Sequence, residues 1–160
     1  MNDVIKDLGY LTMGSRLKRL GERMQADLSR LVRAEGYDVQ AGFLPALGIL
    51  ADHGPTTVGD LAAALGIAQP GVTRMLGQLK KQKLVSMDRA RNDQRQRVVS
   101  LSKSGLTIIE ANRDDLWPRI EKAVANICKD VDGPFIEQLA AIEDALDKKP
   151  LDQRAARDKQ

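Results

Sequence analysis

Aromatic residues are scarce in this chain of 160 residues, which has two Tyr, two Phe and one Trp. Aliphatic side chains must therefore supply most of the core. Because β-sandwiches rely on aromatic and β-branched residues, this composition favours helices. A chain of this length forms one ordinary domain or two small lobes that share a core, and it hides about two-thirds of its unfolded surface.

Cysteine and long apolar runs are also nearly absent. The single Cys128 excludes a disulfide within the chain, and we expect a packed thiol because it lies beside an apolar helical stripe. No run of about 18 apolar residues is present, which argues against a transmembrane span. The first residues lack the basic flank and apolar run of a signal peptide. We therefore expect a cytoplasmic protein with no membrane partner.

Motifs for catalysis and metal binding are missing as well. The single His53 and the single Cys128 are far apart in the sequence, and the chain has no phosphate-binding loop or nucleophile elbow. We therefore expect a protein that is not an enzyme and that has no cofactor and no metal site.

Positive charge is concentrated in one segment. Between Arg74 and Arg97 eight basic side chains stand against Asp88 and Asp93, so this stretch has a net charge of +6 in a chain whose total is +3. The rest of the chain is therefore mildly acidic. An acidic body with one basic segment is typical of a specific nucleic-acid contact, although a solvated basic face gives the same pattern.

The same region has the order of elements that a DNA-reading domain needs. Thr57 and Asp60 resemble a capping box that starts a short helix, Gly66 suits a left-handed turn, and Gln69-Pro70 opens a second helix. We expect two strands to follow, over residues 84–87 and 97–101, joined by a charged tip.

The second helix of this region is amphipathic. The residues that gather on its apolar face are Val72, Met75, Leu76 and Leu79. The residues on its opposite face are Thr73, Arg74, Gly77, Gln78 and Lys81. This face is free to meet a partner surface.

Helices are predicted on both sides of this region, over about residues 7–33, 39–52, 103–130 and 134–148. We expect Pro45 to bend the second of them and Pro118 to kink the third. Residues 149–160 have few apolar side chains and are predicted to be a flexible tail.

Together these motifs resemble the MarR family of bacterial winged helix-turn-helix transcription regulators, over roughly residues 8–146. The segments that carry the resemblance are LAAALGI at 61–67, QPGVTR at 69–74, Leu84-Val85, Asp93-Gln94-Arg95 and VSLSKSG at 99–105. The chain departs from the family pattern in two places. It has Ile-Ala-Gln-Pro where a Ser or Thr commonly caps the second helix, and it lacks the glycine often found before the wing.

The resemblance implies a mainly α-helical fold with a small two- to three-stranded antiparallel wing. It implies a winged helix-turn-helix DNA-binding domain over residues 37–103 and a helical dimerisation region over 1–36 and 104–148. The implied function is that of a homodimeric, sequence-specific DNA-binding transcription regulator. We expect a repressor that binds a pseudo-palindromic operator and is released by a small ligand such as an aromatic acid. A winged-helix protein-interaction module that does not bind DNA is the alternative.

Double-stranded DNA is the partner that this function requires, and the resemblance suggests which residues contact it. Thr73, Arg74 and Gln78 are candidates for base edges, since Arg pairs with guanine and Gln with adenine. Lys81 is a candidate for a phosphate contact. The candidates in the wing are Arg91 for the minor groove, Arg89 and Arg97 for phosphates, and Asp93 with Arg95 for an ion pair that holds the loop.

A small-molecule effector is a further partner that the family implies. The cationic candidates for an effector site are Arg16, Arg19, Arg23 and His53. Alternatively, these residues are ordinary surface or helix-capping residues.

Overall fold

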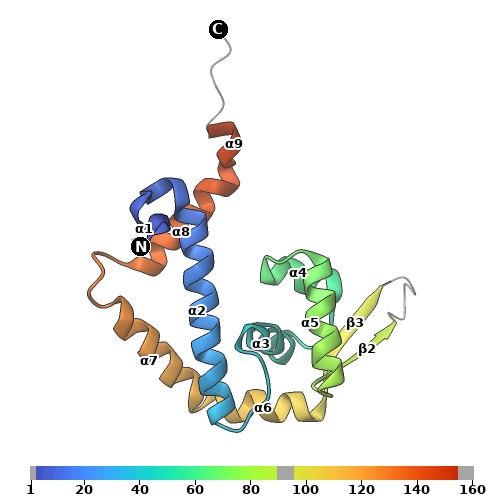
Figure 1. Cartoon of the computed structure of the whole chain (residues 1–160). Coiled ribbons are helices and arrows are strands. Elements are labelled where there is room, and N and C mark those ends of the chain that lie inside the picture. Colours follow the sequence, from blue (N-terminus) through green and yellow to red (C-terminus); the bar gives the residue numbers. More distant parts are fainter. Residues whose placement is uncertain (1–2, 90–95, 155–160) are drawn as a thin grey trace. The chain divides into compact units, whose positions relative to one another are not determined.

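The structure is a computed structural model that describes residues 3–89 and 96–154 (Figure 1). The chain divides into two compact units, residues 1–117 and 118–160. Helices dominate both units, and three short strands in the first unit form one antiparallel sheet. The prediction of a mainly α-helical fold with a small antiparallel wing is confirmed.

The N-terminal part of the first unit consists of α1 (Val4–Asp7), the 3-10 turn η1 (Gly9–Thr12) and α2 (Met13–Ala34). The single helix predicted over residues 7–33 is therefore wrong at its start. Gly9 adopts a φ of +56°, which turns the chain between α1 and α2. Two hydrogen bonds of 3.0 and 2.8 Å from Arg19 to the Asp3 carboxylate hold α1 against α2.

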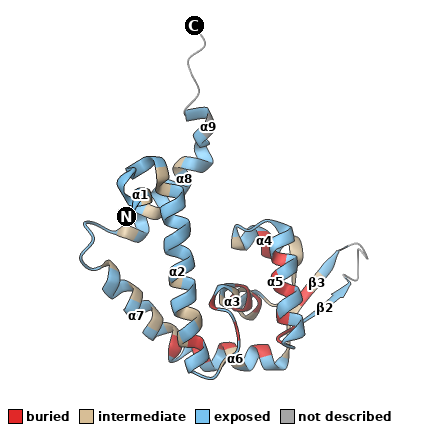
Figure 2. Ribbon diagram, in the orientation of Figure 1, coloured by how far each residue is buried: buried red, intermediate tan, exposed pale blue. Residues whose placement is uncertain are grey.

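A second 3-10 turn, η2 (Ala41–Phe43), leads into α3 (Leu44–His53). Pro45 lies in the first turn of α3, where its missing N–H removes no intrahelical hydrogen bond. The predicted bend at Pro45 is therefore wrong. The buried residues of α3 are Ala46, Leu47, Gly48 and Leu50, and Figure 2 shows much of α3 coloured as buried or intermediate.

The helix-turn-helix and the wing follow α3. Their elements are β1 (Thr56–Thr57), α4 (Val58–Leu65), α5 (Gln69–Lys81), β2 (Val85–Arg89) and β3 (Arg97–Leu101). β3 lies in the middle of the sheet, with β1 and β2 antiparallel on either side. β2 is longer than predicted because Asp88 and Arg89 pair with Val98 and Arg97, so the tip between the strands is shorter.

The core of this lobe follows from the amphipathic pattern of α5. Its residues Val72, Met75, Leu76 and Leu79 are buried as predicted. Each buried side chain of this size stabilises the fold by about 1.5–3 kcal/mol. The predicted turn before α5 is also confirmed, since Gly66 adopts a left-handed φ of +62° after α4.

The base of the wing is closed by hydrogen bonds around Lys83 and Ser102. Lys83 has a φ of +60°, and it takes the left-handed conformation for which the sequence supplies no glycine. Its carbonyl accepts a 2.6 Å bond from Ser102 Oγ, and the Leu84 carbonyl accepts a 2.9 Å bond from Ser102 N. Ser102 also caps α6 (Lys103–Arg113) by accepting a 3.0 Å bond from Gly105 N.

The long helix predicted over residues 103–130 is two helices, α6 and α7 (Leu116–Cys128). The break precedes Pro118 instead of falling at it, because Pro118 then lies in the first turn of α7, where no N–H is needed. At this junction Arg113 pairs with Asp52 of α3 and lies 5.6 Å from the centre of the Trp117 ring.

The second unit contains most of α7 together with α8 (Phe135–Lys148) and the short α9 (Leu151–Arg154). Part of the predicted flexible tail is thus helical, and the Arg154 guanidinium donates hydrogen bonds to the carbonyls of Lys149 and Ala145. α8 has no buried residue, and Cys128 is a free, half-buried thiol. In the described part of the chain no helix combines the length and apolar content needed to cross a membrane.

Replacing Lys83 by Gly is expected to stabilise the fold. The left-handed conformation costs a non-glycine residue about 1 kcal/mol, so Lys83→Gly should raise the free energy of unfolding by about that amount. The measurement is chemical denaturation followed by circular dichroism. Lys83→Ala is the matched control, because it removes the same side chain without relieving the strain. An equal gain in both variants would contradict this account.

Replacing Gly105 by Ala is expected to have the opposite effect. A Cβ at residue 105 would lie 2.2 Å from the Leu84 carbonyl oxygen, so the start of α6 must move away from the wing. Gly105→Ala should lower the free energy of unfolding by about 3 kcal/mol. Gly77→Ala is the control, since nothing lies within 4 Å of its added Cβ. It should raise the stability by up to about 1 kcal/mol.

Candidate nucleic-acid interface

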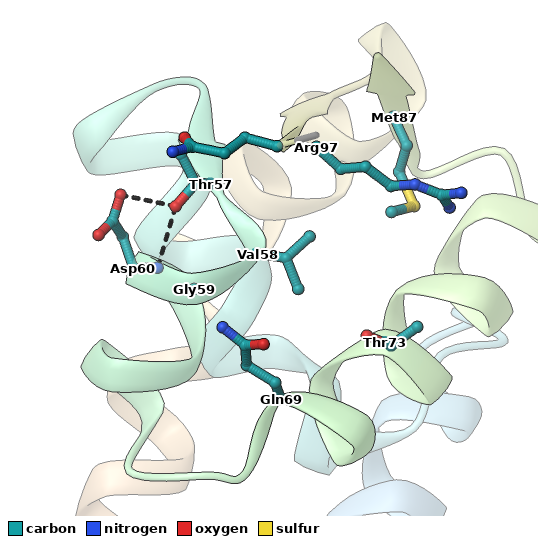
Figure 3. A pocket seen from close by; sticks show the side chains of 9 residues that line it. Thr57, Val58, Gly59, Asp60, Gln69, Thr73, Met87 and Arg97 are labelled. Atoms are coloured by element: carbon teal, nitrogen blue, oxygen red, sulfur yellow. Dashed lines mark hydrogen bonds between the residues drawn. The ribbon is translucent and has the colours of Figure 1, made fainter. Parts of the chain in front are cut away.

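A groove of about 730 Å³ lies between the starts of α4 and α5 and the wing. The residues that line it are Thr57, Val58, Gly59, Asp60, Gln69, Thr73, Met87, Gln96 and Arg97. Figure 3 shows the groove bounded by the two helix starts on one side and by the wing residues Met87 and Arg97 on the other. The helix-turn-helix and the wing therefore form one concave surface.

The α4 side of the groove is held by the predicted cap. Thr57 Oγ1 accepts a 3.1 Å hydrogen bond from Asp60 N and donates a 2.7 Å bond to Asp60 Oδ2 (Figure 3). Asp60 thus reaches the hydroxyl of the cap residue instead of its backbone N–H, which suits the shorter Asp side chain. This pair orients the first turn of α4 toward the groove.

The exposed residues of α5 divide into three rows along the helix. At 100° per residue, Gln69, Thr73 and Lys80 lie on the flank toward the wing, where each lines a hollow of the surface. Arg74 and Lys81 lie on the outer edge and are exposed. α5 therefore presents its wing flank and its outer edge as two adjoining polar surfaces.

Gln78 lies on the third row, away from the wing. Its Oε1 accepts a 3.3 Å hydrogen bond from Gln40 Nε2, and the neighbouring Gln82 donates a 2.6 Å bond to the Asp38 carbonyl. The structure thus brings Thr73 and Arg97 together in the groove, but it does not bring Gln78 to them. The start of α5 also differs from the sequence-based interpretation, because Ala68 is the N-cap residue and makes no side-chain cap.

The wing adds cations beside α5. A second hollow of about 240 Å³ is lined by Lys80, Met87, Asp88, Arg89 and Arg97. Arg89 and Arg97 pair across β2 and β3, so both guanidinium groups extend from the last paired position of the described wing. The predicted wing contacts Arg91, Asp93 and Arg95 lie outside the described residues.

Within residues 3–89 and 96–154 the cations of this surface form no ion pair, although Asp88 lines the second hollow beside them. The ion pairs described for residues 3–89 and 96–154 lie on other surfaces and involve none of Arg74, Lys80, Lys81, Arg89 and Arg97. Each of these cations is therefore available to an anionic partner. A surface with several unpaired cations attracts a polyanion more strongly than a neutral surface does.

Sequence reasoning missed two residues of this surface, Gln69 and Lys80. The sequence pattern indicated Gln69 only as the start of the second helix, and Lys80 is one of the eight basic side chains between Arg74 and Arg97. The helical spacing of both from Thr73 places them on the same flank of α5, a signal present in the sequence. Which flank faces the wing could not be read from the spacing, because the wing is positioned by contacts outside α5.

The predicted effector residues do not form one cluster. Arg19 is already bound to Asp3, and this hydrogen-bonded guanidinium holds the pKa of the Asp3 carboxyl below its ordinary value. Arg16 and Arg23 are exposed on α2, while His53 is exposed at the end of α3. Among the described residues no group of His, Cys, Asp and Glu could hold a metal ion.

Comparison with known proteins finds a resemblance in sequence and in fold. Residues 43–96 match the model of the MarR family. A search among curated protein sequences finds no match. The solved structures that resemble the chain include S. aureus MepR in complex with DNA, at 21% identity and a TM-score of 0.66, covering 86% of this chain and 97% of that one.

Two further structures extend the likeness. A mutant of E. coli MarR complexed with operator DNA has 20% identity and a TM-score of 0.67, covering 92% of this chain and 98% of that one. Bordetella bronchiseptica BpsR, described with a mechanism for regulation of its DNA binding by 6-hydroxynicotinic acid, has 23% identity and a TM-score of 0.57, covering 84% and 96%. Residues 43–96 therefore resemble the MarR family, and the chain has the fold of these structures.

Proposed function

We propose that this chain is a homodimeric, sequence-specific DNA-binding transcription regulator. The observation that carries the proposal is the surface formed by α5 and the wing, whose exposed cations have no ion-pair partner in the described chain. The resemblance to MepR and MarR structures that contain DNA supports the same function. The proposed DNA-binding domain is residues 37–103.

In this proposal α5 enters the major groove of double-stranded DNA. Thr73 and Arg74 contact base edges, and Lys81 contacts a phosphate at the far end of the helix. Arg89 and Arg97 contact the backbone beside the groove, while Arg91 reaches the minor groove and an Asp93–Arg95 pair holds the wing tip. Gln78 has a smaller part than the sequence suggested, because its amide is already bonded to Gln40.

The charge of the wing favours DNA over a protein partner. A wing that packs on another protein needs a largely uncharged centre, since charged residues are depleted in the core of such interfaces. Here Arg89 and Arg97 lie opposite each other on paired strands and Lys80 lies nearby. This arrangement suits a phosphate backbone and disfavours an apolar protein surface.

The proposed dimer interface lies in residues 1–36 and 104–148. In the first unit Tyr10 is 94% exposed and Leu11 is 84% exposed, and in the second unit Ile127 and Ile136 are each 71% exposed. Apolar side chains left in solvent over whole helices mark a surface that a partner covers. A second copy of the chain would cover them and would place two α5 helices on the half-sites of a pseudo-palindrome about 10 base pairs apart.

We further propose that the chain acts as a repressor that a small ligand, such as an aromatic acid, releases from DNA. The resemblance to BpsR, whose DNA binding is described as regulated by 6-hydroxynicotinic acid, supports this regulation. Arg16 and Arg23 are the better cationic candidates for such a ligand. Arg19 would first have to leave Asp3, and His53 lies on a different helix.

The first prediction concerns the arginines of the wing. Arg89→Ala and Arg97→Ala should each weaken binding to the selected operator by about tenfold at low salt, because each removes a charge-assisted contact to phosphate. Each should also reduce the slope of log affinity against log salt by about one. Fluorescence anisotropy with a labelled duplex at several salt concentrations measures both quantities.

The control for this prediction is Lys149→Ala, which removes an exposed cation that follows α8 in the second unit and lies outside the proposed interfaces. It should leave the affinity and the salt slope unchanged. If the wing variants and Lys149→Ala lose the same small amount of affinity, the wing does not contact DNA. If the unaltered chain binds no duplex selectively, the protein-interaction alternative replaces the proposal.

The second prediction concerns the dimer. Leu11→Asp should raise the dissociation constant of the dimer at least about 100-fold, because each copy would bury a charge where an apolar side chain had been buried. Since Leu11 is 84% exposed in the single chain, the variant should still fold. Multi-angle light scattering across a concentration series measures the change.

Ile67→Asp is the matched control for the dimer, since Ile67 is an exposed apolar residue of the helix-turn-helix and lies outside the proposed interface. This variant should remain dimeric. A stable monomer of the unaltered chain at micromolar concentration would rule out the proposed dimer.

A further inference from the structure

Gln69 is a polar residue of the groove whose side chain has no evident role in holding the fold together. It is the first residue of α5, it is exposed, and its side-chain amide has no hydrogen-bond partner among the described residues. Figure 3 shows this amide directed from α5 toward the first turn of α4, with Thr73 one turn further along α5. A free amide therefore lies in the groove between both helices of the helix-turn-helix.

Gly59 on α4 provides the space for this amide. A Cβ at residue 59 would lie 3.1 Å from Gln69 Nε2 and 3.8 Å from Thr57 Oγ1. Gly59 is not among the described residues with positive φ, so the backbone does not require a glycine there. Glycine is also unfavourable within a helix compared with Ala. A side chain at residue 59 would thus displace the Gln69 amide by a few tenths of an ångström.

The chemistry of the amide points to one class of ligand. A Gln side chain presents one acceptor and two donor hydrogens, and it matches the N6 and N7 atoms of adenine in the major groove. Arg97 borders the same groove from β3, so a duplex held there by the wing would also meet the first turn of α5. Gln69 would then reach a base edge next to the one that Thr73 reaches.

We propose that Gln69 determines sequence specificity by bonding to an adenine through its amide, and that Gly59 is the positioning residue that sets the place of this amide. The inference rests on the proposed DNA binding through α5. It adds a specificity contact that was not among the DNA contacts predicted from the sequence. A competing role is that Gln69 only fills the space beside Gly59, in which case it would affect stability and not base preference.

The test begins with selection of the preferred duplex from a randomised library by the full chain. Affinities of the unaltered chain, Gln69→Ala, Gln69→Glu and Gly59→Ala are then measured for every single-base-pair change of that duplex. Gln69→Ala should reduce the preference for A·T at one position in each half-site from roughly 5- to 150-fold to near none. The salt slope should not change, because no phosphate contact is lost.

The other variants separate a base contact from a structural role. Gln69→Glu should reverse the preference at the same position from adenine toward cytosine, since a carboxylate accepts from cytosine N4. Gly59→Ala should reduce the preference there without lowering the thermal midpoint, because it displaces the amide while favouring the helix. Gln153→Ala, which alters an exposed Gln on α9 outside the proposed interfaces, is the control and should change neither quantity.

Two results would overturn the inference. One is that Gln69→Ala binds every duplex more weakly by the same factor while the base preferences stay unchanged. The other is that Gln69→Ala lowers the thermal midpoint and leaves the preferences unchanged, which is the behaviour of a space-filling residue. Either result leaves the proposed function standing, whereas failure of the unaltered chain to select any duplex would remove the proposed function itself.

Discussion

The closure of the wing base by Ser102 is the interaction on which the arrangement of the first unit depends. The Ser102 hydroxyl donates to the Lys83 carbonyl and accepts from Gly105 N, while Ser102 N donates to the Leu84 carbonyl. These bonds join the end of α5, the start of β2, the end of β3 and the start of α6 at one point. The position of the wing relative to α5 is therefore determined by the Ser102 hydroxyl and by backbone groups, which leaves the exposed wing side chains free for contacts with a partner.

Two residues at this point affect the stability of the closure in opposite ways. Gly105 allows α6 to approach the Leu84 carbonyl at a distance that no Cβ would permit. Lys83, in contrast, takes a left-handed conformation that a glycine would adopt with less strain. A strained residue persists where its surroundings determine its conformation, and here the hydrogen bonds to Ser102 do so. The strain energy at Lys83 is small compared with the stabilisation from the buried face of α5, which this closure keeps in place.

Stability and the proposed DNA recognition involve different faces of α5. Its apolar face is packed in the core, since Val72, Leu76 and Leu79 have no exposed surface. Its wing flank and outer edge make no ion pair with the described chain. Substitutions on these two faces should therefore have separable effects, one on folding and the other on binding. Gly59 and Gln69 connect the two helices, because a substitution at Gly59 in α4 is proposed to change the base preference by displacing the Gln69 amide of α5.

Local sequence patterns were sufficient for much of the fold. The cap at Thr57, the turn at Gly66 and the buried face of α5 follow from residues close together in the chain, and each was predicted correctly. Helix ends were predicted less well. Pro45 and Pro118 were taken as bends within helices, but both lie in first turns, because a short break upstream removes the need for their N–H groups.

The sequence by itself determined the order of elements, the concentration of positive charge and the resemblance to the MarR family. The tertiary structure decided which flank of α5 faces the wing, and so which residues share the groove. It brought Gln69 and Thr73 to Arg97, and it placed Gln78 beside Gln40. The physical reason is that helical periodicity specifies only which residues share a face. The element opposite that face is selected by packing and hydrogen bonds between segments far apart in the chain, such as those of Ser102 with Lys83 and Leu84.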